Sequence, residues 1–178
     1  MKTSIVLASL VTSLARVAAA DSFHADVEID PLAYALDGDS VHVGLGAGRY
    51  RVDLGSFAEH MPQFVHGHDG FDVSFAGWGL RLDAFLASEP RGWFAGIDGG
   101  VLRVLAQRQG ADLADEQRQV SIGAHAGYRI TLPDGFYITP WVDVGYSFGA
   151  HDVTFNGATY HASPIEVFPA IHFGMRFR

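Results

Sequence analysis

The sequence contains no cysteine, and after its first twenty residues it has no long apolar run. The absence of cysteine excludes a disulfide framework and a lipid-modified cysteine. No later segment approaches the roughly 18 apolar residues of a membrane-spanning helix, so none is expected. Basic residues are also scarce, with 12 Lys and Arg against 20 Asp and Glu. This acidic balance argues against nucleic acid as a partner.

The first twenty residues differ from the rest and predict a secretory signal peptide. Lys2 gives a positive start, residues 5–14 are mostly apolar, and Ala18-Ala19-Ala20 offers a small-residue cleavage site. A helix retained on the protein is the alternative. Cleavage after Ala20 removes Lys2 and Arg16 from the 12 basic residues, which leaves 10 against 20 acidic residues and a net charge of −10. We expect a signal peptide over 1–20 and one mature domain over 21–178.

What the mature chain has in abundance is a two-residue alternation of polarity. In the clearest segment, Gln119 to Leu132, apolar and polar residues separate onto opposite faces of an extended chain. Pro133-Asp134-Gly135 then predicts a tight turn, after which Phe136 to Phe148 repeats the pattern. The other expected strands are Asp26 to Leu36, Ser40 to Ala47, Tyr50 to Ala58, Phe71 to Leu86, Trp93 to Gln107 and Ile165 to Phe177.

Glycine and proline interrupt some of these strands. Gly77 with Gly79 and the Gly99-Gly100 pair predict bulges or bends at which the alternation slips by one residue. Each proline within a strand removes a donor from the hydrogen-bond ladder, so prolines are expected at bulges or near strand ends. The prolines in question are Pro31, Pro140 and Pro169.

Eight strands need seven connections, and their lengths follow a pattern. The second, fourth and sixth are short: 48–49, 88–92 and 133–135. Three others are longer, at 59–70, 110–116 and 150–164, while the first, 37–39, is short. Short turns on one side and longer loops on the other are typical of outer-membrane barrels, where the turns are periplasmic and the loops extracellular. An even number of strands places both termini on the periplasmic side.

The composition of the two faces distinguishes a membrane barrel from a soluble one. A soluble barrel is apolar inside, whereas a membrane barrel is apolar outside and polar in its lumen. In the clear strands the apolar face carries no charge, and the other face mixes charges with glycine. The chain is 48% hydrophobic with a mean hydropathy of +0.13. We therefore predict an all-β fold, an eight-stranded antiparallel up-and-down transmembrane β-barrel.

The inward-facing charges of such a barrel nearly balance. An eight-stranded barrel is only wide enough to be filled by its own side chains, and buried charges must pair. A closed, salt-bridged lumen is therefore expected, with a proton or ion path as the alternative. The predicted lumen residues are Glu28, Asp30, His42, Arg51, Asp53, Arg81, Asp83, Asp98, Arg103, His125, Arg129, Asp143, Glu166, His172 and Arg176.

The last strand carries a resemblance to a known family. His172-Phe173-Gly174-Met175-Arg176-Phe177 looks like the C-terminal signal that the barrel-assembly machinery reads, with glycine followed by apolar and aromatic residues at alternate positions. Together with the signal segment and the eight-strand rhythm, it resembles small OmpA/OmpX-like outer-membrane barrels. The resemblance implies export through the periplasm, assembly by that machinery and contact with lipopolysaccharide and phospholipid. We expect a monomer without a cofactor.

The long loops hold two further candidate sites. Imidazole and carboxylate groups there could bind Zn²⁺ or Cu²⁺, but solvated polar loop tips are the preferred interpretation, and no metal site is predicted. His161-Ala162-Ser163 with Glu166 has the residue types of a base, a nucleophile and an orienting acid, as a lipid A-modifying enzyme would need. The candidate metal ligands are His60, His66, His68, Asp69, His151, Asp152 and His161.

Three functions remain open at this point. The first is a non-enzymatic structural protein that interacts with partners through its extracellular loops above a closed lumen. The second is a narrow channel, or a transporter of small apolar molecules. The third is a lipid A-modifying enzyme. Fold alone does not decide among them.

Overall fold

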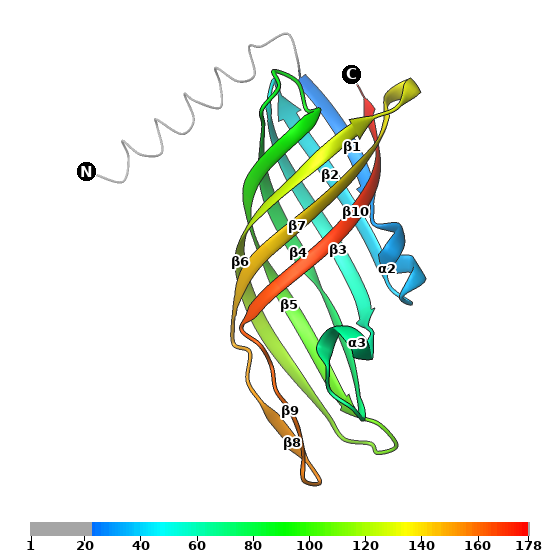
Figure 1. The fold of residues 1–178 in the computed structure, drawn as a ribbon, viewed down its shortest axis with the longest axis vertical. Helices are drawn as coiled ribbons and strands as arrows, with labels where there is room; N and C mark the ends of the chain where they lie inside the picture. The colour runs from blue at the N-terminus through cyan, green and yellow to red at the C-terminus, as the bar shows by residue number, and fades with distance from the viewer. Residues whose placement is uncertain (1–22, 178) are drawn as a thin grey trace, which may run out of the picture.

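A computed structural model describes residues 23–177 and shows a closed barrel of eight antiparallel strands (Figure 1). Neighbours in the ring follow the order β1-β10-β7-β6-β5-β4-β3-β2, which is an up-and-down topology. The strands are β1 (Phe23–Ile29), β2 (Asp39–Ala47), β3 (Tyr50–Met61), β4 (Phe71–Phe85), β5 (Gly92–Arg108), β6 (Ala114–Thr131), β7 (Phe136–Phe148) and β10 (Ile165–Phe177). The predicted all-β, eight-stranded fold is confirmed. The expected signal peptide, 1–20, lies outside the described residues.

Short elements occupy the connections. They are helices α2 (Pro31–Ala35) and α3 (Gln63–His66), the 3₁₀ turn η1 (Pro133–Gly135), and a hairpin of β8 (Val153–Phe155) and β9 (Ala158–Tyr160). Across residues 23–177, no helix has the length and apolar character needed to cross a membrane. We call the end with Phe23, Phe177 and the connections 48–49, 86–91 and 133–135 the turn end, and the opposite end, with α3 and β8–β9, the loop end (Figure 1).

The strand register sets the width of the barrel. Starting at Val27 on β1, successive paired residues lead around the ring to Ile165 on β10. Val27 itself pairs with Met175, ten positions further along β10. This stagger tilts every strand relative to the barrel axis, as Figure 1 shows. At eight strands the interior has room for side chains only.

The outer face is apolar and the inner face polar, as the alternation predicts. On β6, Val120 and Ile122 are 52% and 55% exposed, whereas Gln119 and His125 are 5% and 3% exposed. The same division holds around the ring. Exposed outward residues include Val43, Leu54, Leu80, Ile97, Val144 and Val167. A soluble barrel would have the opposite arrangement, so these faces are those of a membrane barrel.

The first predicted strand, Asp26 to Leu36, is wrong in its second half. β1 stops at Ile29, and α2 follows. The Asp30 side chain caps this helix, because its Oδ1 accepts a hydrogen bond from the Leu32 backbone N–H at 2.9 Å. Pro31 occupies the first turn, where a missing N–H costs nothing. Asp30 is buried as expected, but it serves as a helix cap.

The predicted slips at Gly77, Gly79 and Gly99-Gly100 are also wrong. The β4–β5 and β5–β6 registers run without interruption through these glycines. The polar and apolar positions of β5 exchange after these glycines for another reason. Near the loop end, the inward positions are occupied by the apolar Val104 and Ala106. Arg103 consequently points outward with its side chain 64% exposed, so its predicted place in the lumen is wrong.

The two strand prolines are accommodated without bulges. The β6–β7 ladder lacks two pairs, between Gly127↔Trp141 and Ile130↔Ile138, and then resumes in the same register. Pro140 lies in this gap, so its missing N–H interrupts the ladder locally. Pro169 lies beyond the last β1–β10 pair, Ile29↔Phe173, where β10 has no strand on that side. Its missing donor therefore breaks no ladder bond.

An arginine on the outer face tests whether that face contacts lipid. Val142 is the seventh of the 13 residues of β7 and is 42% exposed. Because a charge near the bilayer midplane must be desolvated, Val142→Arg should lower the free energy of unfolding in lipid vesicles by about 2–4 kcal/mol. Phe64→Arg in α3, where Phe64 is 88% exposed at the loop end, is the matched control and should change it by less than about 1 kcal/mol. Equal effects of the two substitutions would contradict the lipid-facing assignment.

Candidate functional site inside the barrel

A buried arginine organises the half of the lumen nearest the turn end. Arg51, on β3, is 2% exposed and lies against four carboxylates, including Glu28, whose Oε1 is 3.2 Å from Nη2. Its Nη2 donates to Asp26 Oδ1 at 2.6 Å and to Asp53 Oδ2 at 2.8 Å, while Nη1 donates to Asp83 Oδ2 at 3.0 Å. A side chain at Gly44 would collide with both Asp26 and Arg51. Glycine is therefore needed at this inward position of β2.

A buried glutamate gathers two more arginines. Glu28 accepts hydrogen bonds from Arg81 Nη2 at 3.0 Å and from Arg129 Nη2 at 2.6 Å. The remaining faces of these guanidinium groups stack on rings: Arg81 lies 4.7 Å from the Trp141 centroid and Arg129 lies 4.0 Å from that of Tyr137. Such contacts stabilise a cation with little water.

Three histidines complete this set. His42 Nδ1 lies 2.9 Å from Asp53 Oδ1, and His172 Nδ1 lies 2.8 Å from Glu28 Oε2. His125 lies between two carboxylates, with Nε2 2.8 Å from Asp83 Oδ1 and Nδ1 2.6 Å from Asp98 Oδ2. An imidazole can donate to both acids only when both nitrogens carry protons. We call the set the ion network: Asp26, Glu28, His42, Arg51, Asp53, Arg81, Asp83, His125, Arg129 and His172.

The ion network confirms the predicted salt-bridged lumen, with one partner that the sequence analysis missed. Asp26 is fully buried and bonds Arg51, yet it was not among the predicted lumen residues. The sequence contained enough information to include it. Asp26 is two residues before Glu28 on the same strand, so both side chains point to the same face. Arg176, at the turn end, donates to the Pro90 backbone carbonyl at 2.5 Å and so links β10 to the β4–β5 connection. The charges are paired and packed in this half of the lumen.

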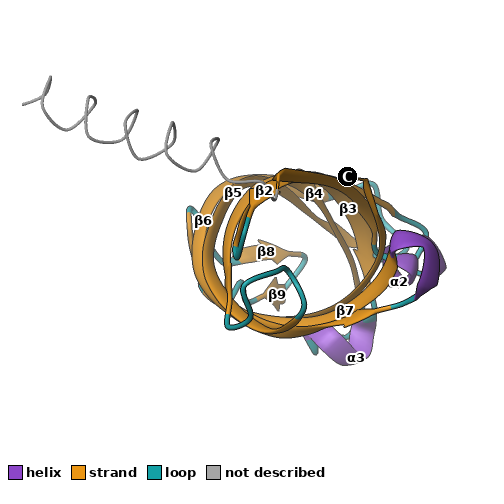
Figure 2. Ribbon diagram, turned by 90° about the horizontal axis from the view of Figure 1, so that it is seen from above, coloured by secondary structure: helices purple, strands orange, loops and turns teal. Residues whose placement is uncertain are grey.

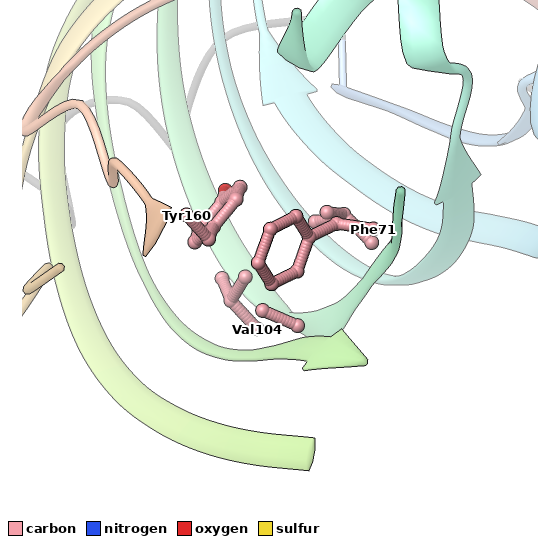
Figure 3. Packing of buried hydrophobic residues seen from close by; sticks show 5 residues of the cluster. Phe71, Val104 and Tyr160 are labelled. Carbon is pink, nitrogen blue, oxygen red and sulfur yellow. The ribbon is translucent and has the colours of Figure 1, made fainter. Parts of the chain in front are cut away.

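The loop end is closed differently, by apolar packing. Phe71 and Val73 on β4 and Val104 and Ala106 on β5 point inward and are buried. Tyr160 from the β8–β9 hairpin packs on them, with its ring centroid 5.9 Å from that of Phe71 (Figure 3). Viewed along the barrel, β8 and β9 lie within the ring of strands (Figure 2). We call this cluster the apolar plug; the sequence analysis had predicted only a longer loop over 150–164, without this hairpin.

The loop histidines meet only in part. The His68 ring lies 6.1 Å from His66 and 5.8 Å from His161, centroid to centroid. His161 Nδ1 bonds Asp152 Oδ2 at 2.7 Å, and this bond lowers the pKa of the Asp152 carboxyl. Partial burial, with His68 next in effect, lowers the pKa of His66. Between residues 23 and 177, no group of three or more ligand side chains has the geometry of a metal site.

The other candidate ligands have different partners. His151 Nε2 faces Asp115 at 3.3 Å, and Asp69 accepts a hydrogen bond from the Gln63 side chain. His60 lies on β3, where its backbone N–H donates to the Leu36 carbonyl.

The residues considered for lipid A chemistry are not assembled. Ser163 Oγ donates to the Ile165 backbone carbonyl at 2.7 Å, and His161 Nδ1 is engaged by Asp152. Glu166 points into the lumen and accepts from Ser147 Oγ at 2.6 Å. A nucleophile needs its base within hydrogen-bond reach. These three side chains form no such unit.

The apolar exterior around a charged lumen defines a membrane-type β-barrel. Among solved structures, the chain is similar to the N-terminal β-barrel domain of Pseudomonas aeruginosa OprF, with a TM-score of 0.46 and 15% identity over 89% of this chain and 98% of that one. It is also similar to Neisserial surface protein A (NspA), with a TM-score of 0.47 and 12% identity over 86% and 94%. The eight-stranded fold is established by the strand pairing, and the resemblance to small outer-membrane barrels stays a prediction.

A weaker likeness, with a TM-score of 0.25, is to the β domain of the Bordetella autotransporter BrkA, at 13% identity over 88% of this chain and 98% of that one. No protein-family model matches the chain, and no curated protein does. The assignment of eight strands rests on the pairing described above.

Removal of the central arginine tests the ion network. Arg51→Met keeps much of the volume but leaves the carboxylates of Asp26, Asp53 and Asp83 without their shared cation. Breaking a buried ion pair costs about 3–5 kcal/mol, so the free energy of unfolding in vesicles should fall by this amount. Arg91→Met, at the exposed turn 86–91, is the control and should leave it nearly unchanged. Equal stability of both variants would mean that the network does not hold the barrel together.

Proposed function

We propose that the protein is an integral outer-membrane barrel that acts as a structural and surface-interaction protein through its loop end. The observation that supports the proposal is packing at two levels of the lumen. The ion network is buried in one half, and the apolar plug packs in the other. A barrel closed in this way offers partners its outer wall and its loops. We also propose that the protein is exported through the periplasm and that the barrel-assembly machinery recognises β10.

The loop end has a surface suited to contacts outside the membrane. Phe64 and Val65 of α3 are 88% and 59% exposed. Exposed apolar side chains of this size on a loop are a common feature of interaction sites. They lie beside Gln63, Gly67 and Asp69, which line a shallow hollow with Phe64. We propose α3 as the main contact point for a partner.

The outer wall near the loop end has a pair of basic side chains suited to lipid phosphates. Arg103 on β5 and Arg118 on β6 are directly opposite each other, with side chains 64% and 85% exposed. Both lie just beyond the apolar Val101 and Val120 of the same strands. Glu116 is 3.8 Å from each, too far for a tight ion pair. Arginines at the loop-end border of the apolar outer wall are in a position to bind the phosphates of lipopolysaccharide or phospholipid.

Cysteine labelling tests the placement and orientation. Because the chain has no cysteine, Phe64→Cys and Ser88→Cys each introduce a single thiol, at the loop end and the turn end respectively. On intact cells a membrane-impermeant maleimide should label the cysteine at 64 and should reach the one at 88 only after the outer membrane is permeabilised. Labelling of Ser88→Cys alone on intact cells would show that the turn end, and not the loop end, faces outward. Equal labelling of both on intact cells would contradict an outer-membrane location.

Conductance separates the closed barrel from the channel. In planar bilayers the mature protein should give no steady openings, because both halves of the lumen are filled. Replacement of residues 153–160 by a short glycine-serine linker should still give none, since the ion network closes the barrel independently. Steady, reproducible openings of the unmodified protein would instead support the channel alternative.

A further inference from the structure

Arg103 on β5 and Arg118 on β6, which we call the arginine pair, keep their donors open on the outer wall. Among residues 23–177, neither guanidinium donates a hydrogen bond, and the acid beside them is Glu116. Its carboxylate lies 3.8 Å from Arg103 Nη1 and 3.8 Å from Arg118 Nε, which is longer than a charge-assisted hydrogen bond. A guanidinium has five N–H donors, so both side chains have most of their hydrogen-bonding capacity available.

No other arginine of residues 23–177 is placed in this way. Those of the ion network are buried, and Arg108 donates to the Gly70 backbone carbonyl at 2.8 Å while it lies over the Phe71 ring. The others lie at the turn end: Arg49, Arg91 and Arg176. This part of the chain contains no lysine. Its outer wall near the loop end therefore carries permanent positive charge at one point, the arginine pair.

The arginine pair brings two like charges together. The β5–β6 register places Arg103 directly opposite Arg118. Side chains opposite each other on one face have Cβ atoms about 4.5–5.5 Å apart, and like charges at this distance are destabilising. Glu116 supplies one negative charge against two positive ones. A phosphate monoester carries a charge of about −1.5 to −2 and three acceptor oxygens, so it compensates both arginines where a single carboxylate does not.

A row of apolar side chains lies beside the arginine pair, two residues closer to the turn end. The register pairs Trp78 with Val101, Val101 with Val120, and Val120 with Phe148, across four strands. All four point outward, with exposed fractions between 52% and 58%. Tyr146 adds a second ring, with its centroid 4.9 Å from that of Phe148. Aromatic side chains in such a position mark the border between hydrocarbon and headgroups on membrane barrels.

The level of the arginine pair along the barrel matches a headgroup layer. Trp93 on β5 is 62% exposed near the turn end, ten residues before Arg103. Ten residues of a strand span about 33 Å, and a tilt of about 40° reduces this to roughly 25 Å along the barrel axis. The apolar band of an outer-membrane barrel is about 25 Å tall. With Trp93 at one border, Arg103 lies at the other, where lipid phosphates begin.

We propose that the arginine pair binds a phosphate monoester of lipid A, the lipid part of lipopolysaccharide, in the outer leaflet. The two guanidinium groups hold the phosphate oxygens, and the acyl chains of the same lipid lie against the row from Trp78 to Phe148. Glu116 competes for the same donors and weakens the site. A phosphodiester, as in phosphatidylglycerol, has only one negative charge and so needs one arginine. The inference rests on the proposed outer-membrane location with the loop end outward, and it selects lipopolysaccharide among the lipids considered there.

Native mass spectrometry of the full mature protein in a non-ionic detergent tests the choice of lipid. Lipid A with both phosphates should bind saturably, and at least about tenfold more tightly than phosphate-free lipid A or phosphatidylglycerol. Absence of saturable binding would overturn the proposal. Equal binding of phosphate-free lipid A would mean that the acyl chains alone are recognised, and equal binding of phosphatidylglycerol would assign the site to phospholipid. Either result would also overturn it.

Substitutions locate the site and test the role of Glu116. Arg103→Gln and Arg118→Gln should each weaken lipid A binding at least about tenfold, whereas Arg91→Gln, at the exposed turn, should not change it. Glu116→Gln should strengthen binding about fivefold, because it removes a like charge beside the phosphate. Heat-modifiable migration confirms that each variant is folded. Unchanged affinity in folded Arg103→Gln and Arg118→Gln, or weaker binding in Glu116→Gln, would contradict the proposal. The comparison of lipids needs no variant, so it decides even where one of these fails to fold.

Failure of this inference is distinguishable from failure of the proposed function. Binding in detergent does not depend on orientation, whereas cysteine labelling at positions 64 and 88 does. Labelling at the loop end together with no preference for lipid A would refute the arginine pair alone. Labelling at the turn end alone would place the arginine pair in the periplasmic leaflet, away from lipopolysaccharide, and would overturn both.

Discussion

The structure depends on the contact between Arg51 and the four carboxylates around it. An eight-stranded barrel in lipid has an apolar outside, so its polar residues have only the lumen to occupy. In so narrow a space each charge loses most of its water, and only a closely matched counter-charge offsets that loss. A planar guanidinium with five donors can hold Asp26, Asp53 and Asp83 at once, which an ammonium group could not do with fixed geometry. Inward positions that face the Arg51 guanidinium, such as Gly44, are glycine because that group leaves no room for a side chain.

The lumen then divides into three levels with different chemistry. The ion network lies nearest the turn end, where strands from opposite sides of the ring are bonded through Glu28 to Arg81 and Arg129. The apolar plug lies nearest the loop end and depends on a hairpin that folds back onto Phe71. Between them lie inward side chains that are half-buried, among them Asp98, Asp143 and Glu166.

Much of this architecture follows from the two-residue period of the sequence. The faces of β6, the turn at Pro133-Asp134-Gly135 and most of the lumen charges were predicted, because alternation alone decides which side chains point inward. Arg103 was misplaced because Val104 and Ala106 are apolar inside the lumen, which contradicts the simple polar-inside rule. The helix at Pro31–Ala35 was missed because Asp30 and Pro31 form an N-terminal cap within an alternating segment. The apolar plug could not be predicted, since it depends on a long-range contact between Tyr160 and β4.

The most direct test of the central claim is nitrogen-15 NMR of the arginine side chains in the mature protein embedded in lipid nanodiscs. If the ion network holds the lumen, Arg51, Arg81 and Arg129 should show Nε–H and Nη–H signals that are separate, resist exchange with water and report restricted rotation. The exposed Arg91, Arg103 and Arg118 should show averaged, rapidly exchanging signals. If all arginines exchange and rotate alike, the lumen is hydrated and mobile, and the account of a barrel closed by paired charges is contradicted.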